Sequence, residues 1–317
     1  MNYDVFNGDA DGIISLVQLR LKHPQESVLV TGVKRDIALL SQAVEHATSV
    51  TVLDISMEKN IAALNSLLAK NVPVFYADHH RSGEMPTSEL LDANIDLDAN
   101  TCTAIIVDKL LDGEFHSWAI AAAYGDNLIA VADAMSDKAN LTAEQSAQLK
   151  ELGTLVNYNG YGSSIDDLHF HPADLYQSLV KYPDPFAMLQ DSSSAFYQLR
   201  EAYQADMQQA MAVDPRYMSD LLAVYELPDQ PWARRISGVF GNLLANEHPD
   251  RAHAVLTLNP TGTYTVSLRA PLTNKVGAGD ICSQFDTGGG RAAAAGVNAL
   301  PLAELPLFIE ATEAYYK

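Results

Sequence analysis

The chain has 317 residues, of which 48% are hydrophobic and 19% charged, and its formal net charge is −20. This length favours two domains, and this composition excludes a disordered protein. No apolar run of about 18 residues and no basic start followed by an apolar stretch is visible, so we expect neither a membrane span nor a signal peptide. Cys102 and Cys282 lie among small or apolar residues. They are expected to be buried free thiols, which predicts a cytoplasmic protein.

The negative charge is unevenly distributed along the chain. From Glu226 onward there are seven basic and nine acidic residues, so the first 225 residues carry −18 of the total. Proteins that hold long nucleic acids neutralise many phosphates with Lys and Arg. The composition therefore argues against a long nucleic acid as partner, whereas an acidic N-terminal half suits metal ions.

In the first half of the chain, short apolar strands alternate with amphipathic helices. Strands are predicted over residues 3–6, 27–31, 50–54 and 72–77, and helices over residues 12–21, 36–45, 60–68, 103–111, 118–134 and 141–155, the last with Thr142 as its cap. This alternation predicts an α/β fold with a doubly wound, mostly parallel sheet and helices on both faces.

The character of the sequence changes after a long predicted helix over residues 194–213, which should stop at Asp214-Pro215. Strands are predicted beyond it over residues 222–225, 254–258 and 264–268. We therefore expect a metal-binding domain over residues 1–190, a helical linker over 191–220 and a smaller α/β substrate-binding domain over 221–317, with the active-site cleft between the two domains.

Residues able to bind a metal follow three of the predicted strands, where open α/β sheets place their active sites. They are Asn7, Asp9 and Asp11 after the first strand, Asp54 at the end of the third, and Asp78, His79 and His80 after the fourth. Carboxylates bind hard divalent ions, and imidazole shifts the preference towards Mn²⁺. The Asp9–Asp11 segment alone is more simply a polar turn that caps a helix, but the other strand ends favour a metal centre.

A glycine run near the C-terminus is the second signal. Gly288, Gly289, Gly290 and Arg291 precede a run of alanines, and we expect them to open a helix whose backbone N–H groups bind an anion. Close helix packing is the alternative. Ser267 and Arg269 end a predicted strand, and the guanidinium could clamp a phosphate.

These motifs together resemble the DHH phosphoesterases, a superfamily that includes RecJ-type exonucleases, nanoRNases, cyclic-dinucleotide phosphodiesterases and family II pyrophosphatases. The resemblance is carried by the segments 7–12, 53–54 and 78–80, by Gly125-Asp126, and by a C-terminal part similar to the DHH-associated domain. It implies a Mn²⁺-dependent phosphoesterase with two ions, for which Mg²⁺ or Co²⁺ could substitute.

The resemblance also implies roles for individual residues. The implied metal ligands are Asn7, Asp9, Asp11, Asp54, His79 and Asp126, with Asp54 as the bridging carboxylate. The implied catalytic residues are Asp54, Asp78 and His80. The implied substrate-binding residues are His80, Ser267, Arg269, Gly288, Gly289, Gly290 and Arg291.

Two residues depart from the family pattern. Asn7 stands where relatives have His or Asp, so we expect a weakened first metal site. Arg291 stands where relatives usually have His. Asp133, seven residues after Asp126 on the same predicted helix, is an alternative last ligand.

Other polar residues carry weaker expectations. His169 and His171 could form a metal pair, but a structural role or a place at the substrate rim is favoured. Lys34 and Arg35 could reach substrate or lie in a solvated loop, and Arg81 could bind phosphate or pair with an acid.

The leading functional hypothesis is a phosphodiesterase that cleaves short linear oligonucleotides to mononucleotides, dinucleotides such as pGpG above all. A cyclic-dinucleotide phosphodiesterase and a pAp phosphatase are the alternatives among enzymes, with a RecJ-like exonuclease behind them. A catalytically weakened nucleotide-binding regulator is the non-enzymatic alternative. No membrane partner is expected, and a homodimer is left open.

Overall fold

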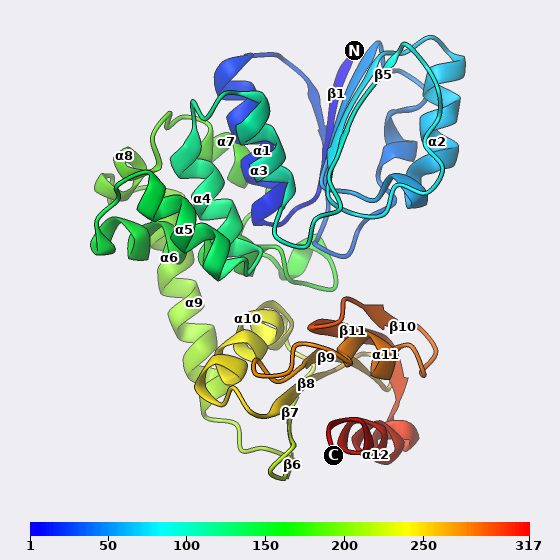
Figure 1. Ribbon diagram of the computed structural model, residues 1–317, viewed down its shortest axis with the longest axis vertical. Coiled ribbons are helices and arrows are strands. Elements are labelled where there is room, and N and C mark those ends of the chain that lie inside the picture. Colours follow the sequence, from blue (N-terminus) through cyan, green and yellow to red (C-terminus); the bar gives the residue numbers. More distant parts are fainter. The chain divides into compact units, whose positions relative to one another are not determined.

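The N-terminal sheet consists of five parallel strands in the order β2-β1-β3-β4-β5 (Figure 1). The computed structural model describes residues 1–317, which divide into two compact units, residues 1–201 and 202–317. The strands of the first sheet are β1 Asn2–Phe6, β2 Val28–Val30, β3 Ser49–Leu53, β4 Val74–Asp78 and β5 Leu91–Ile95. The predicted α/β class with a doubly wound parallel sheet is confirmed.

Helices cover both faces of this sheet (Figure 1). On one face α2 Met57–Ala69 and the short 3₁₀ helix η1 Leu40–Ala43 pack on apolar strand residues, including Val5, Val52 and Tyr76. On the other face lie α1 Ala10–Lys22 and α3 Thr103–Leu110. Helix α1 is buried along almost its whole length because further helices pack on it, and polar residues such as Ser15 and Gln18 are buried with its apolar ones.

The remaining helices of the first unit lie beyond α1. They are α4 His116–Gly125, α5 Ile129–Lys138, α6 Ala143–Asn159, η2 Ile165–Asp167, α7 Pro172–Leu179 and α8 Pro185–Gln190, and α9 Ala195–Met211 runs into the second unit. Thr142 caps α6 as predicted, in a capping box with Gln145.

Two predicted helices of the first unit were wrong, and one strand was not predicted. The helix expected over 36–45 is reduced to the single turn of η1. The helix expected over 118–134 is broken into α4 and α5, because Asn127 adopts a left-handed conformation (φ 63°) directly after Asp126. Strand β5 was missed, since its Leu-Asp-Ala-Asn-Ile sequence is a half-exposed edge strand without an apolar run.

The second unit contains a six-stranded mixed sheet in the order β10-β11-β9-β8-β7-β6, in which only β7 and β8 are parallel. Its elements are β6 Tyr217–Met218, β7 Leu222–Leu227, α10 Pro231–Glu247, β8 Ala252–Leu258, β9 Thr263–Arg269, α11 Ala278–Cys282, β10 Gly288–Gly290, β11 Ala294–Pro301, η3 Leu302–Glu304 and α12 Leu305–Tyr316. The strands predicted over 222–225, 254–258 and 264–268 are confirmed.

The glycine run does not open a helix, which corrects the expectation for Gly288, Gly289 and Gly290. These residues form β10, and the alanines after Arg291 enter β11, so the segment is a β-hairpin. Pairing of β11 with β9 overrides the helix propensity of alanine. Gly290 has φ 144°, and a Cβ at Gly288 would lie 1.8 Å from the Cys282 carbonyl oxygen, so the glycines serve the hairpin.

Both cysteines are buried free thiols, as predicted. None of the helices combines the length and the apolar character that crossing a bilayer requires.

Candidate metal centre

Two of the predicted ligands are fixed by the ends of helices. Asp9 is the N-cap of α1, where its Oδ1 accepts hydrogen bonds from the backbone N–H groups of Asp11 (3.0 Å) and Gly12 (3.1 Å). Asp11 reaches to the start of α3, where its two oxygens accept hydrogen bonds from the N–H groups of Thr103 and Ala104, both at 2.7 Å. Both carboxylates are buried and stabilised by helix N-termini.

Asp54 follows β3 at the carboxyl edge of the sheet. Its backbone is left-handed (φ 58°), a conformation that Asp tolerates better than most residues. The side chain is buried, and its Oδ1 accepts a hydrogen bond from the Thr103 hydroxyl at 3.1 Å. The turn therefore directs the carboxylate towards the same place as Asp11.

His79 follows β4 with its ring orientation fixed. Its Nδ1 donates a hydrogen bond to the Thr101 carbonyl oxygen (3.1 Å), and Nε2 then faces two carboxylates. Nε2 lies 3.5 Å from Asp54 Oδ1 and 3.7 Å from Asp11 Oδ2. In its neutral form, a ring held in this way offers the Nε2 lone pair to a metal ion.

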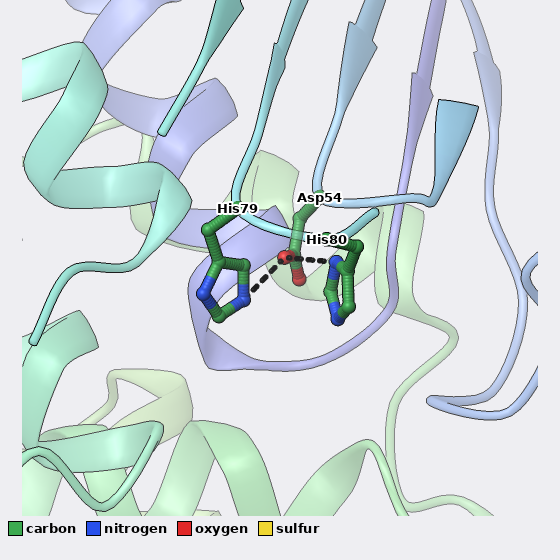
Figure 2. Close-up of side chains that lie close together, drawn as sticks. All are labelled: Asp54, His79 and His80. Carbon is green, nitrogen blue, oxygen red and sulfur yellow. Dashed lines mark ion pairs between the residues drawn. The ribbon is translucent and has the colours of Figure 1, made fainter. Parts of the chain in front are cut away.

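His80 lies on the other side of the Asp54 carboxylate, as Figure 2 shows. Its Nδ1 is 2.7 Å from Asp78 Oδ1 and 3.8 Å from Asp54 Oδ1. Asp78 is fully buried whereas the His80 side chain is 46% exposed, so a buried carboxylate orients a histidine that ligands can reach. Desolvation lowers the pKa of His80, but the hydrogen bond and the charge of Asp78 outweigh it and raise that pKa above its usual value.

A lysine that was not predicted as part of the centre lies among these carboxylates. Lys34 Nζ is 2.5 Å from Asp9 Oδ2, 3.1 Å from Asn157 Oδ1 and 4.0 Å from Asp126 Oδ1. Lys34 follows β2, at the same edge of the sheet as the other residues. Its place after a strand end was the signal that could have identified it.

The two candidates for the last ligand have different surroundings. Asp126, the C-cap of α4, is buried and near Lys34. Asp133 is exposed on α5 and accepts a hydrogen bond from the Tyr124 hydroxyl at 2.7 Å. The charge of Asp126 contributes to the electrostatics of the centre, where it raises the pKa of Asp54.

The carboxylates of the centre repel one another. Burial, followed by the charges of Asp11 and Asp9, raises the pKa of Asp54 well above its usual value. Burial also raises the pKa of Asp11, against the opposing influence of His79. For Asp9, burial acts in the same direction, but the ammonium of Lys34 reverses it and lowers the pKa to about 2. Around Asp11 and Asp54, by contrast, the neighbouring basic groups are the two histidines, His79 and His80.

A divalent cation fits this part of the centre. The separations of 3.5 and 3.7 Å from His79 Nε2 to Asp54 and Asp11 are too long for hydrogen bonds. They approach the spacing of about 3–3.5 Å between ligands that share one cation at bond lengths of about 2.1 Å. Asp54, His79 and His80 also offer ligand atoms that all lie within 4.8 Å of one another.

Asn7 has both ends of its amide engaged. Its Oδ1 accepts a hydrogen bond from the Asp9 N–H (3.2 Å), and its Nδ2 donates one to the Lys34 carbonyl oxygen (3.2 Å). These contacts join the loop after β1 to the loop after β2. Ligation of a metal by Asn7 stays a prediction.

In the second unit, the Arg269 guanidinium contacts α10. Its Nε donates to Asn242 Oδ1 (2.6 Å), its Nη2 to the Gly238 carbonyl oxygen (3.1 Å) and its Nη1 to Ser267 Oγ (2.9 Å). Arg269 thus holds β9 on α10. Arg291 is exposed on the hairpin between β10 and β11.

The remaining polar residues lie in separate surroundings. His169 Nε2 is 2.9 Å from the Tyr158 hydroxyl, and His171 Nδ1 accepts a hydrogen bond from the Ala173 N–H at the start of α7. The two histidines therefore make separate structural contacts. Arg35 and Arg81 are exposed.

Comparison with known proteins gives matches of structure alone. No family model matches the sequence, and no curated protein matches it. The exonuclease RecJ bound to manganese superposes with a TM-score of 0.58 at 15% identity, covering 99% of this chain and 89% of that one. The pGpG-specific phosphodiesterase PggH from Vibrio cholerae gives 0.56 at 13% identity, covering 100% and 99%. An exopolyphosphatase-related protein from Bacteroides fragilis gives 0.55 at 14% identity, covering 99% and 92%.

These matches extend over nearly the whole chain and over both of its units. At such low identity they establish the fold and leave the activity to be argued from the site. The predicted resemblance is thereby confirmed at the level of fold: this chain shares its fold with RecJ, PggH and the exopolyphosphatase-related protein, and an Asp/His cluster lies at the carboxyl edge of its N-terminal sheet.

Proposed function

We propose that the protein is a metal-dependent phosphodiesterase that hydrolyses short linear oligonucleotides, dinucleotides such as pGpG above all, to mononucleotides. The observation that carries this proposal is the buried cluster of Asp11, Asp54 and His79, with its spare lone pairs and its deficit of positive charge. We propose that it holds Mn²⁺, since the set mixes carboxylates with imidazole. A divalent ion bound there supplies a Lewis acid for a phosphoryl group and for the attacking water.

The residues of this chain position that ion and its substrate. The Thr101 carbonyl fixes the tautomer of His79, and the N-terminus of α3 fixes Asp11. His80, half-exposed and oriented by Asp78, is the group we assign to the substrate phosphate. Because the pKa of His80 is raised, its protonated form persists nearer to neutral pH and can donate a charge-assisted hydrogen bond from Nε2.

The small size of the proposed substrate follows from charge. The chain carries −20 overall, and residues 1–201 carry most of it, so a long polyanion is repelled. Among the structural neighbours, PggH is described as specific for pGpG, which is a substrate of the proposed size. A cyclic dinucleotide and pAp stay as alternative substrates of the same chemistry.

A substrate panel with added Mn²⁺ tests the proposal. Linear dinucleotides, cyclic dinucleotides, pAp and a long single-stranded RNA are each incubated with the purified protein, and products are separated by chromatography. We expect linear dinucleotides to be cleaved fastest and the long RNA at least about 100-fold more slowly. Equal rates on the dinucleotide and the long RNA at physiological salt would favour an exonuclease. Nucleotide binding without any hydrolysis would favour a regulator.

A further inference from the structure

The ammonium group of Lys34 lies inside the carboxylate cluster. Its Nζ contacts Asp9 at 2.5 Å and Asn157 at 3.1 Å, with Asp126 at 4.0 Å. Asp9 and Asn157 are both buried. The lysine is therefore held by groups on three separate segments. Its positive charge lies on the side of the centre formed by Asp9 and Asp126.

The backbone of Lys34 is fixed at both ends. Its N–H donates to the Gly160 carbonyl oxygen at 2.8 Å, and its carbonyl oxygen accepts a hydrogen bond from Asn7 Nδ2. The two loops meet closely at this point, because a Cβ on Gly8 would lie 1.9 Å from the Gly32 carbonyl oxygen. Lys34 is thus built into the centre by its loop, rather than reaching in from the surface on a free side chain.

The other groups on this side of the centre are already engaged. Asp9 uses Oδ1 to cap α1 and Oδ2 to bind Lys34. Asn7 is engaged at both ends of its amide. On the opposite side, Nε2 of His79 faces Asp11 and Asp54, and neither carboxylate has an ion pair with a lysine or an arginine.

We propose that the centre holds one divalent ion, among Asp11, Asp54 and His79, and that the ammonium of Lys34 takes the place of a second ion beside Asp9 and Asp126. This inference rests on the proposed metal-dependent function and departs from the expectation of two ions, which stays untested. A second divalent ion at Asp9 would lie next to a fixed positive charge in a buried site, where like charges repel strongly.

The number of bound ions tests this inference without an activity assay. Metal-free protein is dialysed against saturating Mn²⁺, the bound metal is measured per chain, and electron paramagnetic resonance distinguishes isolated from spin-coupled Mn²⁺. We expect one isolated ion in the natural protein. Lys34→Ala, which frees Asp9, should raise the number to two and give a spin-coupled pair, whereas Lys34→Arg should keep one.

Lys109→Ala is the matched control. It removes a lysine that pairs with Asp96 at 3.6 Å on the surface, so the overall charge changes equally. We expect one ion in this variant.

The outcomes separate the two proposals. No bound ion in the natural protein overturns the proposed metal centre itself. Two ions in the natural protein overturn the role of Lys34 while the metal centre stands, and this result does not depend on whether a variant folds. One ion in both the natural protein and a folded Lys34→Ala variant shows that the lysine does not exclude the second ion.

Discussion

The carboxylates around Asp54 in the first unit and Asp206 in the second unit are buried in different ways. Residues 1–201 carry a net charge of −16 and collect buried carboxylates that repel one another around Asp54. Residues 202–317 carry only −4, and their buried Asp206 is matched by Arg235 through two hydrogen bonds of 2.8 and 3.1 Å. Burying a charge without an opposite charge beside it destabilises the folded protein, so we expect such charges where a ligand supplies the opposite charge. A buried charge that is paired within the chain needs no ligand.

The strongest test of this contrast replaces one buried carboxylate in each unit. Asp54→Asn should lower phosphodiesterase turnover on the order of 10³-fold, because a ligand of the ion is lost. The same change should raise the melting temperature of the metal-free protein. A carboxyl whose pKa is raised in the folded state favours the folded protein below its ordinary pKa, and this contribution is lost as the pH rises. At neutral pH the ionised carboxylate therefore lowers the free energy of unfolding.

Asp206→Asn is the matched change in the second unit. It should lower the melting temperature, since the ion pair between Asp206 and Arg235 would be lost, and leave turnover per folded molecule unchanged. Turnover close to normal in Asp54→Asn with excess Mn²⁺, or a lower melting temperature in that variant, would contradict the contrast.

The next largest effect concerns His253, which is fully buried on β8. Desolvation first, and then the charges of Arg251 and His248, lowers its pKa to about 4. In the unfolded chain this histidine takes up a proton at about pH 6.5. Its contribution to the free energy of unfolding should therefore be fully present above that pH and fall by up to about 3 kcal/mol as the pH drops towards 4.

Urea unfolding of the natural protein and of His253→Leu at several pH values measures this effect. The variant should lose the part of the pH dependence that lies between pH 6.5 and 4. His46→Leu removes a histidine that is 72% exposed and should keep it. If the free energy of unfolding of His253→Leu depends on pH as it does in the natural protein, another group is responsible.

A smaller effect is expected from Arg269. Removing its hydrogen bonds to Asn242, Gly238 and Ser267 should destabilise the second unit by about 2–3 kcal/mol. Thermal unfolding of Arg269→Ala checks this. A variant that keeps its melting temperature but loses dinucleotide cleavage would place Arg269 in substrate binding instead.

The smallest expected effect is that of Arg291, which is exposed on its hairpin. We propose that it contacts the substrate, so Arg291→Ala should lower kcat/KM on a dinucleotide about tenfold, or about 1.4 kcal/mol, with no change in melting temperature. Hydrolysis of a small activated phosphodiester, which needs only the metal centre, serves as the control and should be retained. A loss on both substrates would argue against a role in recognising the second nucleotide.

Strand periodicity was sufficient to predict the parallel sheet and to place Asp54 and His79 at one edge, because strand ends are local features of the sequence. Two features of the structure depend on contacts between segments that are distant in the sequence. The contact of Lys34 with Asp9 depends on two loops that meet at Gly8 and Gly32, and nothing in either loop alone indicates it. The segment from Gly288 to Gly296 has the composition of a helix start, but strand pairing with β9 determines its structure.

The contacts of Asp11 have a consequence for how the protein would bind the proposed metal ion. Both carboxylate oxygens already accept hydrogen bonds from the first turn of α3, and His79 is already oriented by Thr101. The ligands therefore need no rearrangement and no folding step before an ion arrives, in contrast to small zinc domains that are unfolded without metal. We expect the protein to lose and regain its ion reversibly, so that its activity follows the supply of manganese rather than the rate at which new chains are made.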